Sequence, residues 1–226
     1  MAPKNSFYPL LIFVLISSVV IGQSYSDIIN RLDRQLKRGE TSISKVLSND
    51  SLMYLHSLTS FREIIKENAK PEKIIIASSH EPGTKITVKG HVVDKKGKAY
   101  KNILLYFYQT SDSGWYADTA AHILEKEGDM KHARLFGYLK TDEKGEFSFE
   151  TIKPNGYPKS SITGHIHIQC MVSDSKSLTG PAELHFEDDR RMNKLRKKEI
   201  LEEGNLTAKN TGTAKKPVYE YKIVAE

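Results

Sequence analysis

The spacing of apolar residues along the chain changes at Pro71. From Ser26 up to this proline they recur every three or four positions, which predicts two amphipathic helices. Gly39 is expected to close the first helix, and Asp50 or Ser51 to cap the second, which ends at Pro71. No polar residue recurs on either apolar stripe, so both helices should pack on the downstream domain or on a second subunit. The second arrangement would make a homodimer.

Beyond Pro71 apolar and polar residues alternate, with turn residues roughly every eight to twelve positions, which is typical of a β-sandwich or barrel. We therefore expect an all-β sandwich over residues 72–226, preceded by a short helical extension over residues 23–71. The predicted strands cover residues 74–77, 86–93, 103–108, 135–140, 146–150, 165–172, 182–186 and 218–224.

The composition is that of a folded protein. The 226 residues are 38% hydrophobic and 27% charged and carry a net charge of +6, unlike a disordered chain. The 34 Lys and Arg residues are spread over both halves without a basic block, so we expect no nucleic-acid partner. A run of mixed charge at residues 190–203 is expected to form the solvated face of a helix or loop.

Residues 1–22 differ from the rest of the chain. They contain one lysine, Lys4, no acidic residue and an apolar run over residues 10–21. A run of about a dozen apolar residues is shorter than the ~20 that span a bilayer, so we expect a cleavable export signal rather than a membrane anchor. The mature chain should begin near Gln23, lack a membrane span and be secreted or periplasmic.

One predicted strand carries the strongest local signal, His165 and His167. Residues two apart on a strand point to the same face, so both imidazoles should project one way while Ile166, Ile168 and Cys170 project into the core. Because Cys170 projects into the core, we expect its thiol to be buried. It is also the single cysteine, so no disulfide can form within the chain. The imidazoles would form a two-nitrogen metal site, although exposed histidine pairs on sheets are also common.

Other kinds of metal site use a close histidine pair. A cupin would need a glutamate four or five residues after the second histidine, where Met171 and Val172 stand. Zinc hydrolases usually add a third histidine or a carboxylate. The remaining histidines of this chain form no second close pair, so the choice depends on other residues.

Tyr116 and Tyr157 change the choice of metal. A phenol has an ordinary pKa near 10 and binds a metal at neutral pH only if the ion is acidic enough to deprotonate it, as Fe(III) is. Two phenolates with two imidazoles would therefore select Fe(III) over zinc. Taken singly, Tyr157 before Pro158 could be a turn residue, and Tyr116 beside Trp115 could anchor the long polar insertion predicted at residues 111–134.

Six segments between about residues 85 and 189 follow one another in a distinctive order. They are ITVKGHVVD at residues 86–94, Gln109 with Gly114-Trp115-Tyr116, TDEKGEFSF at residues 141–149, Thr151-Ile152-Lys153-Pro154 with Gly156-Tyr157-Pro158, Gly164-His165-Ile166-His167, and LHFED at residues 184–188. In this order they resemble the intradiol ring-cleavage dioxygenases. These are non-haem ferric enzymes that open catechols between their two hydroxyl-bearing carbons.

The resemblance implies the roles of the site residues. It makes Tyr116, Tyr157, His165 and His167 the ligands of Fe(III), with Tyr157 and His167 axial and the other two equatorial. A catechol-type substrate would displace Tyr157, and O2 would then be inserted between the hydroxyl-bearing carbons. Tyr157 would also help to take up the protons of the catechol, which makes it a catalytic residue as well as a ligand.

Three positions depart from the family pattern. Ile162 stands where an arginine usually stabilises negative charge on the substrate ring, and Glu183 stands close to the place of a usual glutamine. Tyr138 stands where an arginine is often found shortly before the Thr141-Asp142 turn. Losing one positioned donor can cost ~10²–10³ in rate. Either Lys153 or Lys159 substitutes, or the chain is a divergent member with altered substrate or weak activity. The alternative function is a catalytically weak or inactive binding module with the same sandwich fold.

Overall fold

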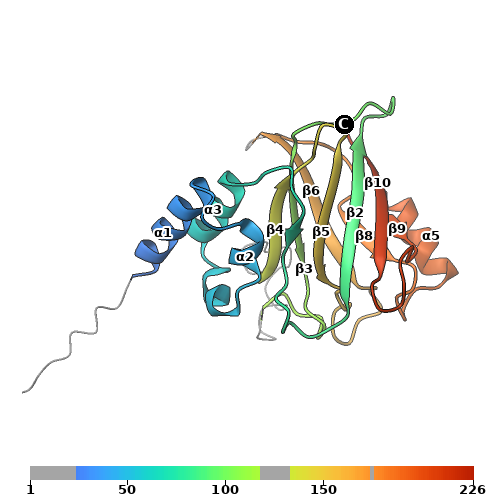
Figure 1. Ribbon diagram of the computed structural model, residues 1–226. Helices are drawn as coiled ribbons and strands as arrows, with labels where there is room; N and C mark the ends of the chain where they lie inside the picture. The colour runs from blue at the N-terminus through green and yellow to red at the C-terminus, as the bar shows by residue number, and fades with distance from the viewer. Residues whose placement is uncertain (1–23, 118–132, 174–175) are drawn as a thin grey trace, which may run out of the picture.

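The structure of the protein is a computed structural model that describes residues 24–117, 133–173 and 176–226 (Figure 1). Two β-sheets stack face to face, with a group of N-terminal helices on one side and a further helix on the other. The predicted export signal at residues 1–22 lies outside the described residues. Most of the predicted insertion, residues 118–132, also lies outside them.

The two sheets contain four and six strands. The order in the four-stranded sheet is β1 (Ile74–Ile75), β5 (Glu146–Ile152), β2 (Lys85–Val93) and β10 (Val218–Val224). The order in the six-stranded sheet is β4 (Leu135–Lys140), β3 (Leu104–Gln109), β6 (His165–Ser173), β8 (Glu183–Phe186) and β9 (Leu206–Ala208), with β7 (Lys176–Ser177) paired to β6. The predicted all-β sandwich is thus confirmed.

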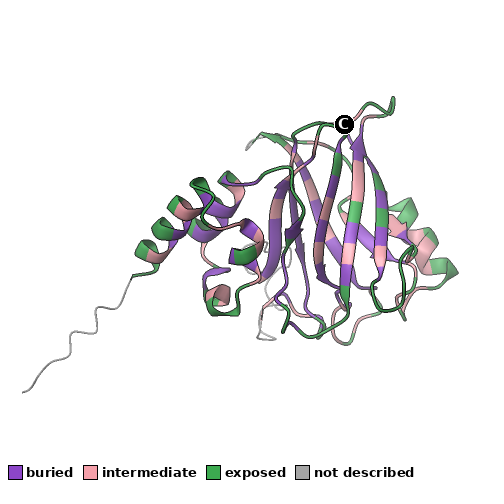
Figure 2. Ribbon diagram, in the orientation of Figure 1, coloured by how far each residue is buried: buried purple, intermediate pink, exposed green. Residues whose placement is uncertain are grey.

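The core lies between the facing surfaces of the two sheets. Phe107 on β3 packs against Phe147 and Phe149 on β5, with ring centroids 5.5 and 4.3 Å apart. Buried and more exposed positions alternate along several strands (Figure 2), as expected where one face of a sheet meets the core. This packing decides which face of each strand remains for a functional site.

Every predicted strand is present. The bounds of β4 and β10 agree with the prediction, whereas β1 is shorter and β5 extends to Ile152. The strands β7 and β9 were not predicted, because segments of two and three residues are too short to display an alternating pattern. β9 exists through its parallel pairing with β8, which is a long-range contact.

The N-terminal extension is divided into more elements than predicted. It contains α1 (Tyr25–Lys37), α2 (Ile43–Leu47), the 3-10 helix η1 (Asp50–Leu55) and α3 (Thr59–Glu67). The first predicted helix is correct, and it ends before Gly39, whose φ of 70° only glycine adopts easily. The short α2 lies in the segment that the prediction had left between its two helices.

The second predicted helix is wrong as a continuous element. Asn49, rather than Asp50 or Ser51, caps η1, and α3 ends at Glu67 rather than at Pro71. Between η1 and α3 lies His56, which is fully buried and donates from Nδ1 to the carbonyl oxygen of a residue preceding β4 at 2.6 Å. This tertiary contact lies at the break between η1 and α3, and the helical spacing of the sequence did not indicate it.

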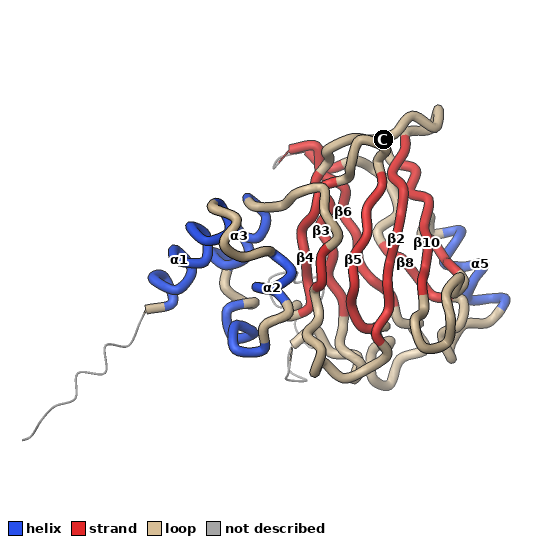
Figure 3. The backbone as a smooth tube through the Cα atoms, in the orientation of Figure 1, coloured by secondary structure: helices blue, strands red, loops and turns tan. Residues whose placement is uncertain are grey.

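The apolar face of α1 is buried against α3, and α3 packs on the sandwich. Leu32 and Leu36 of α1, with Phe61 and Ile65 of α3, belong to one cluster with the residues of the sheets. The helices lie beside the β4 edge (Figure 3), and α3 contacts β4. Of the two predicted arrangements, the structure has packing on the chain's own domain. The sequence argument for a homodimer through these stripes therefore no longer applies.

The mixed-charge run contains α5 (Lys194–Glu202), whose first turn is capped by the side chain of Asn193. The helix contacts β9, and Ile200 is its buried residue. Most of the rest of α5 is exposed or half-buried, as predicted for a solvated face. Across the described ranges, no helix has both the length and the apolar character needed to cross a bilayer.

Candidate metal centre

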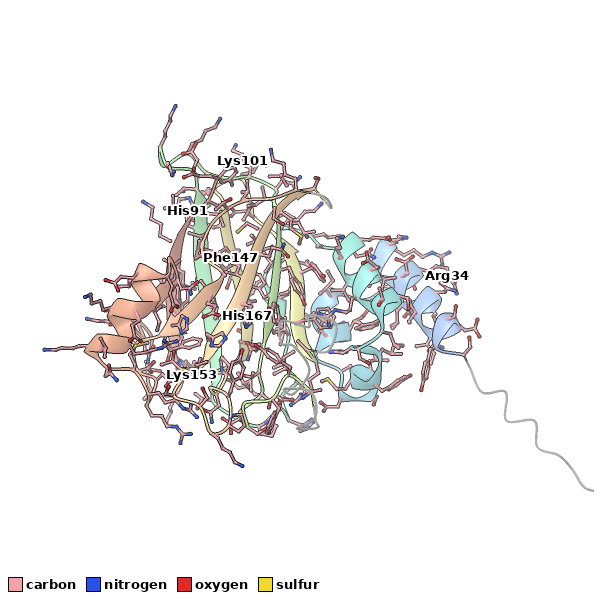
Figure 4. All side chains as sticks on the ribbon, turned by 180° about the vertical axis from the view of Figure 1, so that it is seen from behind. Arg34, His91, Lys101, Phe147, Lys153 and His167 are labelled. Atoms are coloured by element: carbon pink, nitrogen blue, oxygen red, sulfur yellow. The ribbon has the colours of Figure 1, made fainter. Side chains whose placement is uncertain are left out.

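Strand β6 presents its histidines on the outer face of the six-stranded sheet. Ile166, Ile168 and Cys170 are at most 5% exposed and face the core, and His165 and His167 alternate with them. Burial raises the pKa of the Cys170 thiol to about 12, so it is not a nucleophile. His167 lies between α5 on one side and the N-terminal helices on the other (Figure 4). The predicted orientation of the strand is confirmed.

Two tyrosines from distant segments meet these histidines. The Tyr116 hydroxyl lies 2.6 Å from the Tyr157 hydroxyl and 2.7 Å from Nε2 of His167. Nε2 of His165 lies 3.2 Å from Nε2 of His167 and 3.4 Å from the Tyr157 hydroxyl. The four residues named from the sequence as candidate ligands therefore bring their donor atoms together around one point.

The spacing of these four atoms suits a single metal ion. Two donors that are each about 2.1 Å from an ion and at right angles to one another are about 3.0 Å apart. The four separations between neighbouring donors run from 2.6 to 3.4 Å, on both sides of that value. Two phenol oxygens and two imidazole nitrogens are a donor set that suits ferric iron.

Two glycines allow the tyrosine-bearing segments to approach each other. Gly114 has a φ of 83°, and a Cβ added to it would lie 2.4 Å from the carbonyl oxygen of Gly156. A Cβ on Gly156 would in turn lie 1.9 Å from the carbonyl oxygen of Ile162. No side chain fits at either place without moving the backbone, so these glycines permit the meeting of Tyr116 and Tyr157.

Hydrogen bonding determines which nitrogen of His165 faces the centre. Its Nδ1 lies 2.9 Å from the carbonyl oxygen of Thr163, which can only accept, so Nδ1 carries the proton and Nε2 keeps its lone pair. Burial lowers the pKa of His165. The ring is therefore neutral and its free nitrogen is directed at the other three donors.

His167 is held by a stacked ring. Its imidazole lies 4.3 Å from the ring of Tyr108 at an interplanar angle of 7°, because β3 and β6 pair these two residues directly. Burial, with a contribution from His165, lowers the pKa of His167 to about 3. Like its neighbour, His167 is a neutral imidazole that can donate an electron pair to a metal.

Tyr116 is a protonated phenol in the absence of a metal. Burial and the neighbouring Tyr157 raise its pKa, and the residue is 5% exposed. Binding to a metal must therefore displace a proton that is held more firmly than in free tyrosine. This requirement favours a strongly acidic ion such as Fe(III) over Zn(II).

Glu183 adds a carboxylate beside the histidines. It pairs with His167 in the register of β8 on β6, and one carboxylate oxygen lies 3.8 Å from Nε2 of His165 and 4.0 Å from Nδ1 of His167. These three side chains form a cluster that could hold a metal ion. Burial alone would raise the pKa of Glu183, but a hydrogen bond from His185 is the largest influence that lowers it, and the resulting pKa is about 2.

Sequence reasoning overlooked the residues that orient this carboxylate. His185 donates from Nε2 to Glu183 at 2.8 Å, and its Nδ1 accepts from the Thr163 hydroxyl, also at 2.8 Å. Thr163 thereby contacts both His165 and His185. The side-chain oxygen of Asn205 accepts from the backbone N–H of Glu183 at 3.0 Å. The two-residue spacing of Glu183 and His185 on one strand was the available signal.

The structure does not place either predicted lysine at the four donors. Lys153 pairs with Asp188 at 2.7 Å, and Lys159 is exposed. Ile162 is half-buried, and its N–H donates to the Ser160 hydroxyl at 3.1 Å. Burial, and to a much smaller extent the charge of Arg196 on α5, lowers the pKa of His165.

Comparison with known proteins agrees with this geometry. Catechol 1,2-dioxygenase of Candida albicans is 31% identical over 84 residues, which are 37% of this chain and 26% of that relative. The match thus spans about a quarter of the relative's length. The dioxygenase domain of a dioxygenase carbohydrate-binding protein fusion from Streptomyces sp. SirexAA-E has a TM-score of 0.51 at 24% identity, covering 69% of this chain and 88% of its own.

A second solved structure, an intradiol ring-cleavage dioxygenase from Tetranychus urticae, has a TM-score of 0.53 at 17% identity over 70% of this chain and 87% of its own. These structures show a shared fold. Residues 61–196, more than half of the chain, match the family model described as "Dioxygenase". This range includes all four convergent donors. The chain therefore belongs to this dioxygenase family, as its resemblance to the intradiol ring-cleavage enzymes had indicated.

Proposed function

We propose that the protein is an exported non-haem Fe(III) dioxygenase that cleaves a catecholic ring between its two hydroxyl-bearing carbons, incorporating both atoms of O2. The observation that carries the proposal is the convergence of Tyr116, Tyr157, His165 and His167. A binding module that needs no metal has no reason to bring four such donors together. The same convergence therefore argues against the alternative of an inactive module.

Bound Fe(III) would draw electron density from a chelated catechol and make a ring carbon reactive toward O2. The chain's own residues would bind the ion and handle protons. Tyr157 is half-buried, whereas Tyr116 is buried, so Tyr157 is the tyrosine better placed to leave the centre and take up a catechol proton at its hydroxyl. The neutral rings of His165 and His167 would remain as ligands throughout.

Protein loaded with Fe(III) is expected to be wine-red, because charge transfer from tyrosinate to ferric iron absorbs visible light. The measurement is an absorption spectrum combined with iron analysis, followed by O2 uptake and product identification with catechol. A muconic-type dicarboxylate containing both oxygen atoms of 18O2 is the expected product. A colourless protein that contains one iron per chain would contradict the phenolate ligands and with them the proposal.

Ile162 provides a test of the missing positive charge. If an arginine at this position reaches the substrate ring, Ile162→Arg should raise turnover of simple catechols by up to ~10²-fold, since a positioned donor stabilises the transition state more than the ground state. Steady-state O2 uptake with catechol, protocatechuate and hydroxyquinol is the measurement. Ile162→Lys is the control, because it adds a positive charge without the planar guanidinium group of arginine. Fast turnover by the unmodified protein would show that another group already acts there.

Export is the part of the proposal that rests on residues 1–22 alone. The mature chain is expected to begin at or near Gln23 and to be found outside the cytoplasm. Amino-terminal sequencing of protein recovered from the medium or periplasm is the measurement. An intact amino terminus on protein from a cytosolic fraction would refute this part, and would leave the proposed reaction unaffected.

A further inference from the structure

Arg62 of α3 is a buried cation outside the metal centre. Its side chain is 6% exposed, and no carboxylate among the described residues forms an ion pair with it. Nη1 instead donates to the carbonyl oxygens of His56 and Ala133, both at 3.0 Å. Nη2 donates to the Tyr106 hydroxyl, and the guanidinium lies 3.7 Å from the centre of the Phe136 ring.

These contacts join three parts of the chain. His56 belongs to the helical extension, Tyr106 to β3, and Ala133 to the segment that enters β4. A buried guanidinium is costly unless its donors are satisfied. The burial of Arg62 is therefore favourable only while all three parts keep their relative positions.

The segment that Arg62 holds is also bonded to a candidate ligand. The N–H of Arg134 donates to the carbonyl oxygen of Tyr116 at 2.9 Å. The carbonyl oxygen and the side chain of Arg134 are bonded as well. The carbonyl oxygen accepts from Nδ1 of His56 at 2.6 Å, and the guanidinium donates to both carboxylate oxygens of Glu81 at 2.5 and 2.6 Å. Ala133 and Arg134 thus connect the helical extension to the backbone of Tyr116.

We propose that Arg62 is a positioning residue for the metal centre. By holding Ala133 it keeps the backbone of Arg134, and through it that of Tyr116, where the phenol meets His167 and Tyr157. This inference rests on the proposed function, because it takes Tyr116 to be a ligand. The helical extension is then a part of the metal site's support, and it does more than cover the β4 edge.

The first experiment needs no metal. In Arg62→Met the backbone amide of Arg134 should exchange with deuterium about tenfold faster than in the wild type or more, because its hydrogen bond to Tyr116 opens more often. The matched control is Arg31→Met on α1, which removes an exposed arginine of the same extension and should leave this amide unchanged. Arg62→Lys keeps the positive charge but loses the planar guanidinium group and its fixed donors. It replaces Arg62→Met in this experiment if Arg62→Met does not fold.

The second experiment uses the iron-loaded protein and its charge-transfer band. Arg62→Lys should shift and weaken the band in the wild-type and Tyr157→Phe backgrounds, but should have no further effect in Tyr116→Phe. Residues that act through one another give such non-additive pairs. An Arg62 effect of equal size in both tyrosine backgrounds, or unchanged Arg134 exchange in every folded Arg62 variant, would overturn the inference. If wild-type protein shows no charge-transfer band, the proposed function fails, while the exchange measurement still decides the role of Arg62.

Discussion

Replacing His167 by alanine is expected to abolish iron binding and ring cleavage while leaving the sandwich folded. The imidazole lies on the outer face of β6 and contributes one of the four convergent donors. Loss of a residue that merely orients a ligand already weakens metal binding by ~10–100-fold, so loss of a ligand should exceed that. We expect O2 uptake with catechol to fall by at least about 100-fold, in step with iron content.

The matched control for His167→Ala is Gln169→Ala. Gln169 is two residues further along β6 on the same face, and within the described part of the chain its side chain bonds only to Ser177, at 2.8 Å. It should retain iron, colour and activity. Circular dichroism and thermal unfolding of both variants separate ligand loss from unfolding. If folded His167→Ala kept a full complement of iron, His167 would not be a ligand.

Replacing Ile166 by aspartate should unfold the domain, although it changes the residue between the two histidines. Ile166 is fully buried in the core, on the opposite face of β6. An unpaired carboxylate there has no hydrogen-bond partner, and such changes belong to the class that costs more than about 4 kcal/mol. A domain has only about 5–15 kcal/mol of stability in total, so little folded protein should remain at 25 °C.

Ile166→Val is the control for this prediction, since it removes one methylene and should cost roughly 0.5–1.5 kcal/mol. Denaturant unfolding followed by circular dichroism measures both variants. A folded Ile166→Asp protein with a normal transition would mean that β6 can rotate or slip by one residue. The histidines would then lose their common outward face, and the site described above would be incorrect.

The family resemblance supplied more of the site than the local patterns did. Tyr116 and Tyr157 are separated by a segment of which residues 118–132 lie outside the described part of the chain, and no periodicity relates the two tyrosines. Only the order of motifs placed them with His165 and His167. Their 2.6 Å contact depends on Gly114 and Gly156, whose role is visible once the two backbones lie together.

Local patterns were sufficient for whatever depends on the direction of neighbouring side chains. The alternation around His165 and His167 determined the common face of the imidazoles and the burial of Cys170, because successive residues of a strand point to opposite sides whatever surrounds them. The same reasoning yielded eight of the ten described strands of the sandwich. These properties belong to the backbone, and the sequence by itself determined them.

The tertiary structure decided what depends on residues far apart in the chain. His56 reaches the segment before β4 where a continuous helix was predicted, His185 and Thr163 orient Glu183 and His165, and Arg62 joins the helical extension to the sandwich. A buried polar group takes whichever partner the folded chain brings within hydrogen-bond distance, and desolvation penalises every arrangement that leaves it without one. Those partners are defined only when the sheets and helices have packed.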